Sequence, residues 1–198
     1  ARAQIKTLLL QGFSQPSIST PVRHKLSDAI SEVARDEPWP ELLPLLFQAV
    51  KDQSPSLRES AFRIFAAAPE TAGANNTANM IPVFDAGFQD SSDDVRVAAC
   101  NAFVLFFKEL PKKSWSQLSP LLPGLLSLLP PFLQNGQEQA LLSVLEALID
   151  LVELAPKMFK DMFAQVIDFC SGIAKSSDLE GTTRIAALEL LTTFSEVS

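Results

Sequence analysis

Apolar residues recur at helical spacing along almost the whole chain, and the segments that carry them come in pairs. The first helix of each pair is expected at about 2–14, 39–53, 77–89, 112–134 and 157–175. The second helix is expected at about 20–35, 55–68, 93–110, 137–155 and 179–197. Alternation of apolar and polar residues, which is typical of half-buried strands, is rare. The pattern therefore predicts an all-α protein.

The second helices share one apolar stripe, which is counted from an arginine near the start of each helix. Three and seven residues after this arginine the side chains are Leu26 and Ile30, Ala61 and Phe65, Ala99 and Phe103, and Ala187 and Leu191. Residues with this spacing lie on one face of a helix, and the small alanines would let a partner helix approach closely. The fourth pair departs from the pattern, because Gln139 stands where the arginine should be.

A proline, an aspartate eight residues later and an arginine six residues after that recur as one set. The set occurs as Pro44, Asp52 and Arg58, again as Pro82, Asp90 and Arg96, and its second half returns as Asp178 and Arg184. A period of about 35 to 45 residues is typical of stacked helical repeats. We therefore expect an α-solenoid of about five helix pairs, wound as a right-handed superhelix. The expected repeats are about 1–36, 37–70, 71–110, 111–155 and 156–198.

The spacing of these charges suggests a structural role, which we call the aspartate–arginine ladder. The aspartate would lie in the turn between paired helices, and the arginine in the first turn of the second helix. We expect Arg58 and Arg96 to reach Asp52 or Asp90, so that charge-assisted bonds tie successive turns together. The prolines are expected to kink consecutive first helices at the same place. A binding role for the same charges remains the alternative.

Charge and composition exclude several functions. The formal net charge is −7, and Lys112 and Lys113 are the only adjacent basic pair, so binding to nucleic acid is not expected. An acidic protein is better suited to basic partners. Cys100 and Cys170 lie in apolar periodic segments and are expected to be buried thiols. Residues 115–133 are apolar, but four prolines and three serines interrupt them, so no membrane span is expected.

Candidate catalytic chemistry is lacking in the sequence. His24 is the only histidine, and no cysteine lies near it in the sequence, which argues against a metal site or a nucleophile–base pair. The seven glycines are scattered, so no phosphate-binding loop is expected. The sequence therefore predicts a protein that binds other proteins, with no enzymatic activity and no cofactor.

An acidic stripe is the main candidate for a binding surface. Glu146, Asp150 and Glu153 are spaced to share one face of the fourth second helix, and Glu189 continues the acidity in the fifth. We expect this stripe on the concave side of the solenoid, where it could bind a basic partner. A solvated helix face is the alternative. Glu146 also lies seven residues after Gln139, where an apolar residue is expected, so the register of this helix is in question.

Several stretches resemble a known family. Proline in the first helix, aspartate in the turn and Val95-Arg96 at the start of the second helix form the pattern of HEAT repeats. Residues 39–50, WPELLPLLFQAV, followed by LRESAFRIF, resemble early repeats of the importin-beta (karyopherin-beta) nuclear transport receptors. Residues 109–133 and 148–163, which include ELAPKMFKDMF, resemble the importin-beta-3 branch of that family.

This resemblance implies a function and a set of partners. The chain would be an N-terminal-side part of a longer nuclear import receptor and would act as a monomer in the cytoplasm, the nucleus and the nuclear pore complex. Its inner second helices would contact the GTP-bound form of the GTPase Ran, and the cargo would be basic proteins such as ribosomal proteins or histones. A HEAT-repeat scaffold such as a phosphatase regulatory subunit shares the ladder pattern and is the alternative.

The resemblance also implies grooves for the Phe-Gly repeats of nucleoporins between the outer first helices. The candidate residues on these helices are Phe47, Phe84, Phe88 and Phe163. Most of these rings are expected in the core, and one or two are expected to border a groove that accepts an inserted phenylalanine.

Overall fold

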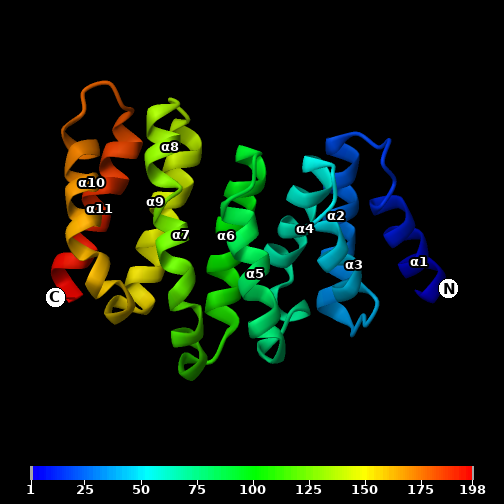
Figure 1. Cartoon of the computed structure of the whole chain (residues 1–198). Helices are drawn as coiled ribbons and strands as arrows, with labels where there is room; N and C mark the ends of the chain where they lie inside the picture. Colours follow the sequence, from blue (N-terminus) through cyan, green and yellow to red (C-terminus); the bar gives the residue numbers. More distant parts are fainter. Residues whose placement is uncertain (1, 198) are drawn as a thin grey trace. The chain divides into compact units, whose positions relative to one another are not determined.

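The computed structural model describes residues 2–197, which form helices joined by turns with no strand in that range (Figure 1). Residues 1 and 198, the outer limits of the first and last expected repeats, lie outside the described residues. The chain divides into two compact parts, Ala1–Pro111 and Lys112–Ser198, which we call the N-terminal and C-terminal parts. The all-α fold class predicted from the apolar pattern is confirmed.

Helix hairpins stack side by side in the N-terminal part. Helices α1 and α2, α3 and α4, and α5 and α6 pack in pairs, and the second helices α2, α4 and α6 pack in a row. The bounds are α1 (Arg2–Phe13), α2 (Thr20–Asp36), α3 (Leu42–Ala49), α4 (Pro55–Ala67), α5 (Thr77–Phe88) and α6 (Asp93–Glu109), with short 3-10 turns η1 (Pro69–Thr71) and η2 (Ala74–Asn76).

The core of this part is rich in phenylalanine. The ring of Phe84 on α5 lies 6.4 Å from Phe62, 5.4 Å from Phe103 and 5.5 Å from Phe106, measured between centroids. Close packing also requires a glycine in α5. A Cβ atom at Gly87 would lie 2.6 Å from the Cβ of Ala99 and 2.7 Å from the ring of Phe62. Gly87 therefore lets α5 approach both second helices.

The C-terminal part repeats the hairpin arrangement with interrupted first helices. Helix α8 packs on α9, α10 packs on α11, and the second helices α9 and α11 lie side by side. The bounds are η3 (Lys112–Leu121), α7 (Leu122–Leu126), α8 (Leu129–Gln134), α9 (Glu138–Leu154), η4 (Pro156–Met162), α10 (Phe163–Lys175) and α11 (Gly181–Val197).

Prolines explain where the first helices differ from expectation. The continuous helix expected at 112–134 is broken into η3, α7 and α8, because Pro120, Pro123, Pro130 and Pro131 cannot donate backbone hydrogen bonds. The helix expected to start at residue 157 starts at Phe163, after the 3-10 segment that Pro156 opens. Helix α3 is also shorter than the expected range of 39–53.

The shared kink expected at Pro44 and Pro82 is not supported by their positions. Pro44 is the third residue of α3 and lies in its first turn, where a backbone N–H has no helical partner in any case. Pro82 lies in the interior of α5 and does remove a helical bond, to Ala78. Both Pro82 and Ala78 are exposed, so water can solvate the carbonyl that loses its partner. The two prolines therefore occupy different positions in their helices.

Within the described residues, no helix combines the length and the apolar character needed to cross a bilayer.

Candidate functional site

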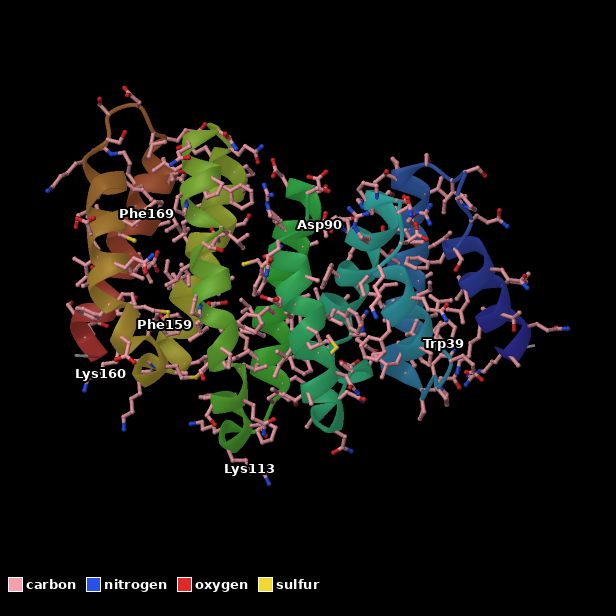
Figure 2. All side chains as sticks on the ribbon, viewed as in Figure 1. Trp39, Asp90, Lys113, Phe159, Lys160 and Phe169 are labelled. Atoms are coloured by element: carbon pink, nitrogen blue, oxygen red, sulfur yellow. The ribbon has the colours of Figure 1, made fainter. Side chains whose placement is uncertain are left out.

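Arg58 links two successive repeats of the N-terminal part. Its Nε and Nη2 atoms donate to the two carboxylate oxygens of Asp90 at 2.7 and 2.9 Å. Asp90 lies in the turn between α5 and α6 (Figure 2). The third nitrogen, Nη1, donates to the carbonyl oxygens of Asp52 and Gln53 at 2.8 and 3.0 Å. Arg58 thus pairs with the aspartate of the next repeat, as the ladder predicts, and with the backbone of its own turn.

Arg58 and Asp90 each shift the pKa of the other. Burial alone would raise the pKa of Asp90, but hydrogen bonds from Arg58 and from the backbone N–H of Ser92 outweigh it. The charges of Arg58 and Arg96 act in the same direction, so the pKa of Asp90 lies below its ordinary value. The hydrogen bond to Asp90 raises the pKa of Arg58 against the effect of burial. Both groups are held in their charged forms.

The other ladder arginines bind mainly to the ends of preceding helices. Arg96 donates to the carbonyl oxygen of Asp90 at 2.9 Å and forms an ion pair with Asp93. Arg184 donates to the carbonyl oxygen of Ala174, in the last turn of α10, at 3.2 Å. The carbonyl of Ala174 has no partner within α10, and that of Asp90 lies two residues beyond the end of α5; at both places a guanidinium suits the negative end of the helix dipole. The arginines therefore cap helix C-termini, a role that their spacing did not predict.

Arg23 shows the same capping role in the most buried setting. Its side chain donates to the carbonyl oxygens of Phe13 and Gln15, and only 1% of the residue is exposed. Burial lowers the pKa of Arg23, and the charge of Asp52 partly opposes that shift. Arg23, in the first turn of α2, thus forms a buried link between the end of α1 and the start of α2.

The fifth repeat departs from the ladder. Within the described residues no ion pair joins Asp178 to Arg184, because Arg184 reaches back to the carbonyl of Ala174. Asp178 is exposed, and its carboxylate lies 3.5 Å from the hydroxyl of Ser177. The fifth repeat therefore keeps the spacing of the ladder residues Asp178 and Arg184 without a salt bridge between them.

A glycine replaces the ladder in the fourth repeat. Gly136 follows α8 with a φ of 68°, in the left-handed region that glycine adopts without strain. Its N–H donates to the carbonyl of Leu133 at 3.2 Å, and the N–H of Gln137 donates to the carbonyl of Phe132 at 2.9 Å. These two bonds form a Schellman cap. The end of α8 is therefore satisfied by backbone alone, which explains why Gln139 can replace the arginine.

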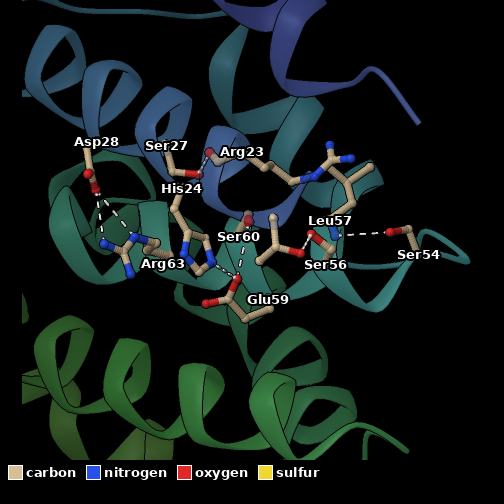
Figure 3. A network of polar contacts seen from close by, with 11 residues as sticks. Arg23, His24, Ser27, Asp28, Ser54, Ser56, Leu57, Glu59, Ser60 and Arg63 are labelled. Atoms are coloured by element: carbon tan, nitrogen blue, oxygen red, sulfur yellow. Dashed lines mark hydrogen bonds and ion pairs between the residues drawn. The ribbon is translucent and has the colours of Figure 1, made fainter. Parts of the chain in front are cut away.

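Polar pairs join equivalent positions of α2 and α4 (Figure 3). His24 and Glu59, each the fifth residue of its helix, lie 2.7 Å apart, and Asp28 and Arg63, each the ninth, lie 3.2 Å apart. Sequence reasoning missed these pairs. The sequence did contain a signal for them, because the two residues of each pair are 35 positions apart, the same separation as that between Arg23 and Arg58.

The acidic stripe lies on α9 and α11 and forms what we call the acidic face: Glu146, Asp150, Glu153 and Glu189. Glu146, Glu153 and Glu189 are exposed and Asp150 is half-buried, whereas Leu141, Val144, Leu145 and Leu148 of α9 are buried. The apolar stripe of this helix is thus shifted relative to the count from Gln139, which removes the conflict at Glu146. Glu146 and Glu189 are each the ninth residue of their helices, and α9 packs against α11.

The candidate phenylalanines fall into two groups. Phe84 and Phe88 are buried and pack on Phe103, so they belong to the core, as expected for most of these rings, and neither can border an open groove. Phe47 and Phe163 are half-buried. The ring of Phe163 lies 4.8 Å from that of Phe194, which holds its orientation.

Metal-ligating clusters and reactive thiols are the two kinds of chemical group that the described residues allow us to check. Among residues 2–197, no group of three or more His, Cys, Asp or Glu is placed to hold a metal ion. Cys100 and Cys170 are buried free thiols, and burial raises the pKa of each to about 12. Thiols with this pKa are not nucleophilic at neutral pH.

Comparisons with known proteins agree on one group. The sequence pattern of the family described as "IPO5-like, TPR repeats" matches residues 18–169. Importin subunit beta-3 of Saccharomyces cerevisiae is 51% identical over 196 residues, which cover 98% of this chain and 18% of that protein. The crystal structure of Kap121p matches with a TM-score of 0.89 and 52% identity, covering 98% of this chain and 19% of that chain.

Complexes of the same neighbour match equally well. Crystal structures of Kap121p bound to Nup53p and of Kap121p bound to Pho4p each match with a TM-score of 0.88 and 51% identity, covering 98% of this chain and 19% of that chain. This chain therefore spans about a fifth of the length of these relatives.

Proposed function

Because this chain belongs to the IPO5-like family of TPR repeats, we propose that it is a segment of a nuclear import receptor. The observation that carries the proposal is 51% identity to importin subunit beta-3 over 98% of the chain. A receptor of this kind would shuttle between cytoplasm and nucleus through the nuclear pore complex. Its partners would be the GTP form of Ran, Phe-Gly nucleoporins and basic cargo.

Basic proteins such as ribosomal proteins or histones are the proposed ligands of the acidic face. In the N-terminal part, the neighbouring helices α2 and α4 carry opposite charges at their ninth positions, where Asp28 pairs with Arg63. In the C-terminal part the ninth positions are both acidic, Glu146 and Glu189, and no described salt bridge involves either. Like charges at such positions repel each other, so a basic segment would relieve the repulsion.

Charge reversal tests this surface. We expect the variant Glu146→Lys, Glu153→Lys to bind a basic peptide at least several-fold more weakly at low salt, with a smaller loss at physiological salt because ions screen the attraction. The matched control is Asp161→Lys, Asp168→Lys, which makes the same change in net charge at exposed positions on η4 and α10. Equal binding by both variants would leave a solvated helix face as the explanation.

Ran binding is proposed from family membership and needs its own test. The chain immobilised on beads is expected to retain Ran loaded with a non-hydrolysable GTP analogue and not Ran loaded with GDP. Retention of neither form would place the Ran contacts outside this segment of the receptor, and the scaffold interpretation would then gain support.

Phe-Gly binding is proposed at the half-buried rings of Phe47 and Phe163 on the first helices. A peptide titration followed by NMR chemical shifts is expected to perturb residues around one or both rings. The substitution Phe163→Ala should remove the shifts around that ring, with Phe47→Ala as the reciprocal variant. Shifts confined to the second helices would contradict this placement.

A further inference from the structure

The turn between α10 and α11 contains a ladder aspartate that the ladder does not use. Residues 176–180 connect the two helices outside any helix, and Figure 1 shows the turn extending beyond the ends of both. Arg184 binds the carbonyl of Ala174 instead of this turn. A carboxylate oxygen of Glu138 accepts a hydrogen bond from the backbone N–H of Glu180 at 2.5 Å, at the far end of the turn. The middle of the turn is left exposed.

An exposed serine in this turn is followed by two exposed carboxylates. Ser177 has Asp178 one residue later and Glu180 three residues later, and all three are exposed. Protein kinases choose substrates partly by charge pattern, and acid-directed serine kinases use basic side chains to bind carboxylates at these two positions. We propose that Ser177 is a phosphorylation site for a kinase of this class.

The reaction is an ordinary phosphoryl transfer from ATP. The hydroxyl oxygen of Ser177 attacks the γ-phosphorus, the bond from that phosphorus to the bridging oxygen of ADP breaks, and ADP leaves. The hydroxyl proton passes to the catalytic aspartate of the kinase. The product carries a charge of about −1.5 to −2 at neutral pH, beside Asp178 and Glu180. Phosphorylation would therefore make this edge of the C-terminal part more acidic.

A second serine with the same spacing provides an internal control. Ser91 is exposed and has Asp94 three residues later. Its turn is held on both sides, because Asp90 is bound by Arg58, and Asp93 pairs with Arg96 in the first turn of α6. A kinase must draw the residues around the serine into its own cleft, and residues 177–180 form a turn outside any helix, whereas residues 93 and 94 belong to a helix. The fold thus distinguishes two similar motifs.

The experiment compares the folded chain with peptides. Synthetic peptides covering residues 84–98 and 171–186 are expected to be phosphorylated by an acid-directed serine kinase with ATP, whereas the folded chain is expected to be modified at Ser177 and not at Ser91. The variant Ser177→Ala should lose most of the incorporated phosphate, and Ser91→Ala should lose none. Asp178→Asn and Glu180→Gln should each lower the rate several-fold without changing the circular dichroism spectrum.

Two results would overturn the proposal. One is a folded chain in which Ser177 stays unmodified while its peptide is modified, since the fold would then block the site. The other is modification of Ser91 in the folded chain as fast as that of Ser177, since the argument from the two turns would then fail. Phosphopeptide mapping separates the two sites, so each outcome can be read directly.

Discussion

Single residues hold the turns of this protein mainly through backbone carbonyls. Arginines near the starts of α2, α4, α6 and α11 all donate to backbone carbonyl oxygens in the last turn of the preceding helix or in the turn that follows it. A guanidinium has five N–H donors, so Arg58 can bind two carbonyls and both oxygens of Asp90 at once. An ammonium group is a compact point charge and could not reproduce this geometry.

Removing Arg58 is therefore expected to destabilise the N-terminal part. The side chains of Arg58 and Asp90 are 13% and 10% exposed, so Arg58→Ala would leave a buried carboxylate and two carbonyls without their donor. We expect a loss of about 1–3 kcal/mol in the free energy of unfolding, measured in urea. Arg58→Lys should recover less than half of it. A change below about 0.5 kcal/mol for Arg58→Ala would contradict the role of this pair.

The same pair predicts a dependence of stability on pH. The pKa of Asp90 is lower in the folded chain than its ordinary value, so the folded state favours the carboxylate. Its stabilisation is fully present above the unfolded pKa of about 3.9 and is lost as the pH falls through the folded pKa. The variant Asp90→Asn should thus be less stable than the wild type at pH 7, and the difference should shrink at pH 3. An equal difference at both pH values would rule out this linkage.

At the scale of elements, sequence periodicity predicted the second helices far better than the first. The bounds of α2, α4, α6 and α9 lie within about two residues of expectation, because each helix has an uninterrupted apolar stripe. The first helices were misjudged where prolines divide them, as between η3 and α8. Arg58 with Asp90 could be predicted because side-chain spacing recurs. The capping role of the arginines could not be predicted, because every residue has a backbone carbonyl and the side-chain pattern does not mark which carbonyls accept a hydrogen bond.

Two glycines in first helices make a matched test of packing. Gly87→Ala would place a Cβ 2.6 Å from that of Ala99, so α5 must shift, and we expect a loss of about 1–3 kcal/mol. Gly172 in α10 has no atom within 4 Å of its added Cβ, so Gly172→Ala should stabilise by about 0.5–1 kcal/mol. Thermal unfolding of both variants measures the difference. Stabilisation by Gly87→Ala would contradict the close approach of α5 to α6.

At the scale of the whole molecule, the acidic side chains behind the net charge of −7 differ in whether a salt bridge joins them to a neighbouring helix. Asp28, His24 and Glu59 on the second helices of the N-terminal part have partners on the neighbouring helix. At the position equivalent to Asp28, the ninth of the helix, α9 and α11 both carry glutamate, Glu146 and Glu189. Composition alone predicted an acidic protein, but it could not show which acids are paired, since pairing depends on which helices become neighbours. We therefore place the proposed basic partner on the C-terminal part.

The pairing of α2 with α4 has a consequence for how the stability of this protein should be measured. Guanidinium chloride is itself a salt and screens exposed ion pairs as it unfolds a chain, whereas urea does not. Asp28 and Arg63 are 49% and 43% exposed in their side chains, so their attraction should be felt in urea and be nearly absent in guanidinium. The extrapolated free energies from the two denaturants should then disagree by a few tenths of a kcal/mol, and Asp28→Asn should narrow the gap. If the difference between the two extrapolated free energies keeps its full size in Asp28→Asn, charges other than this pair cause it.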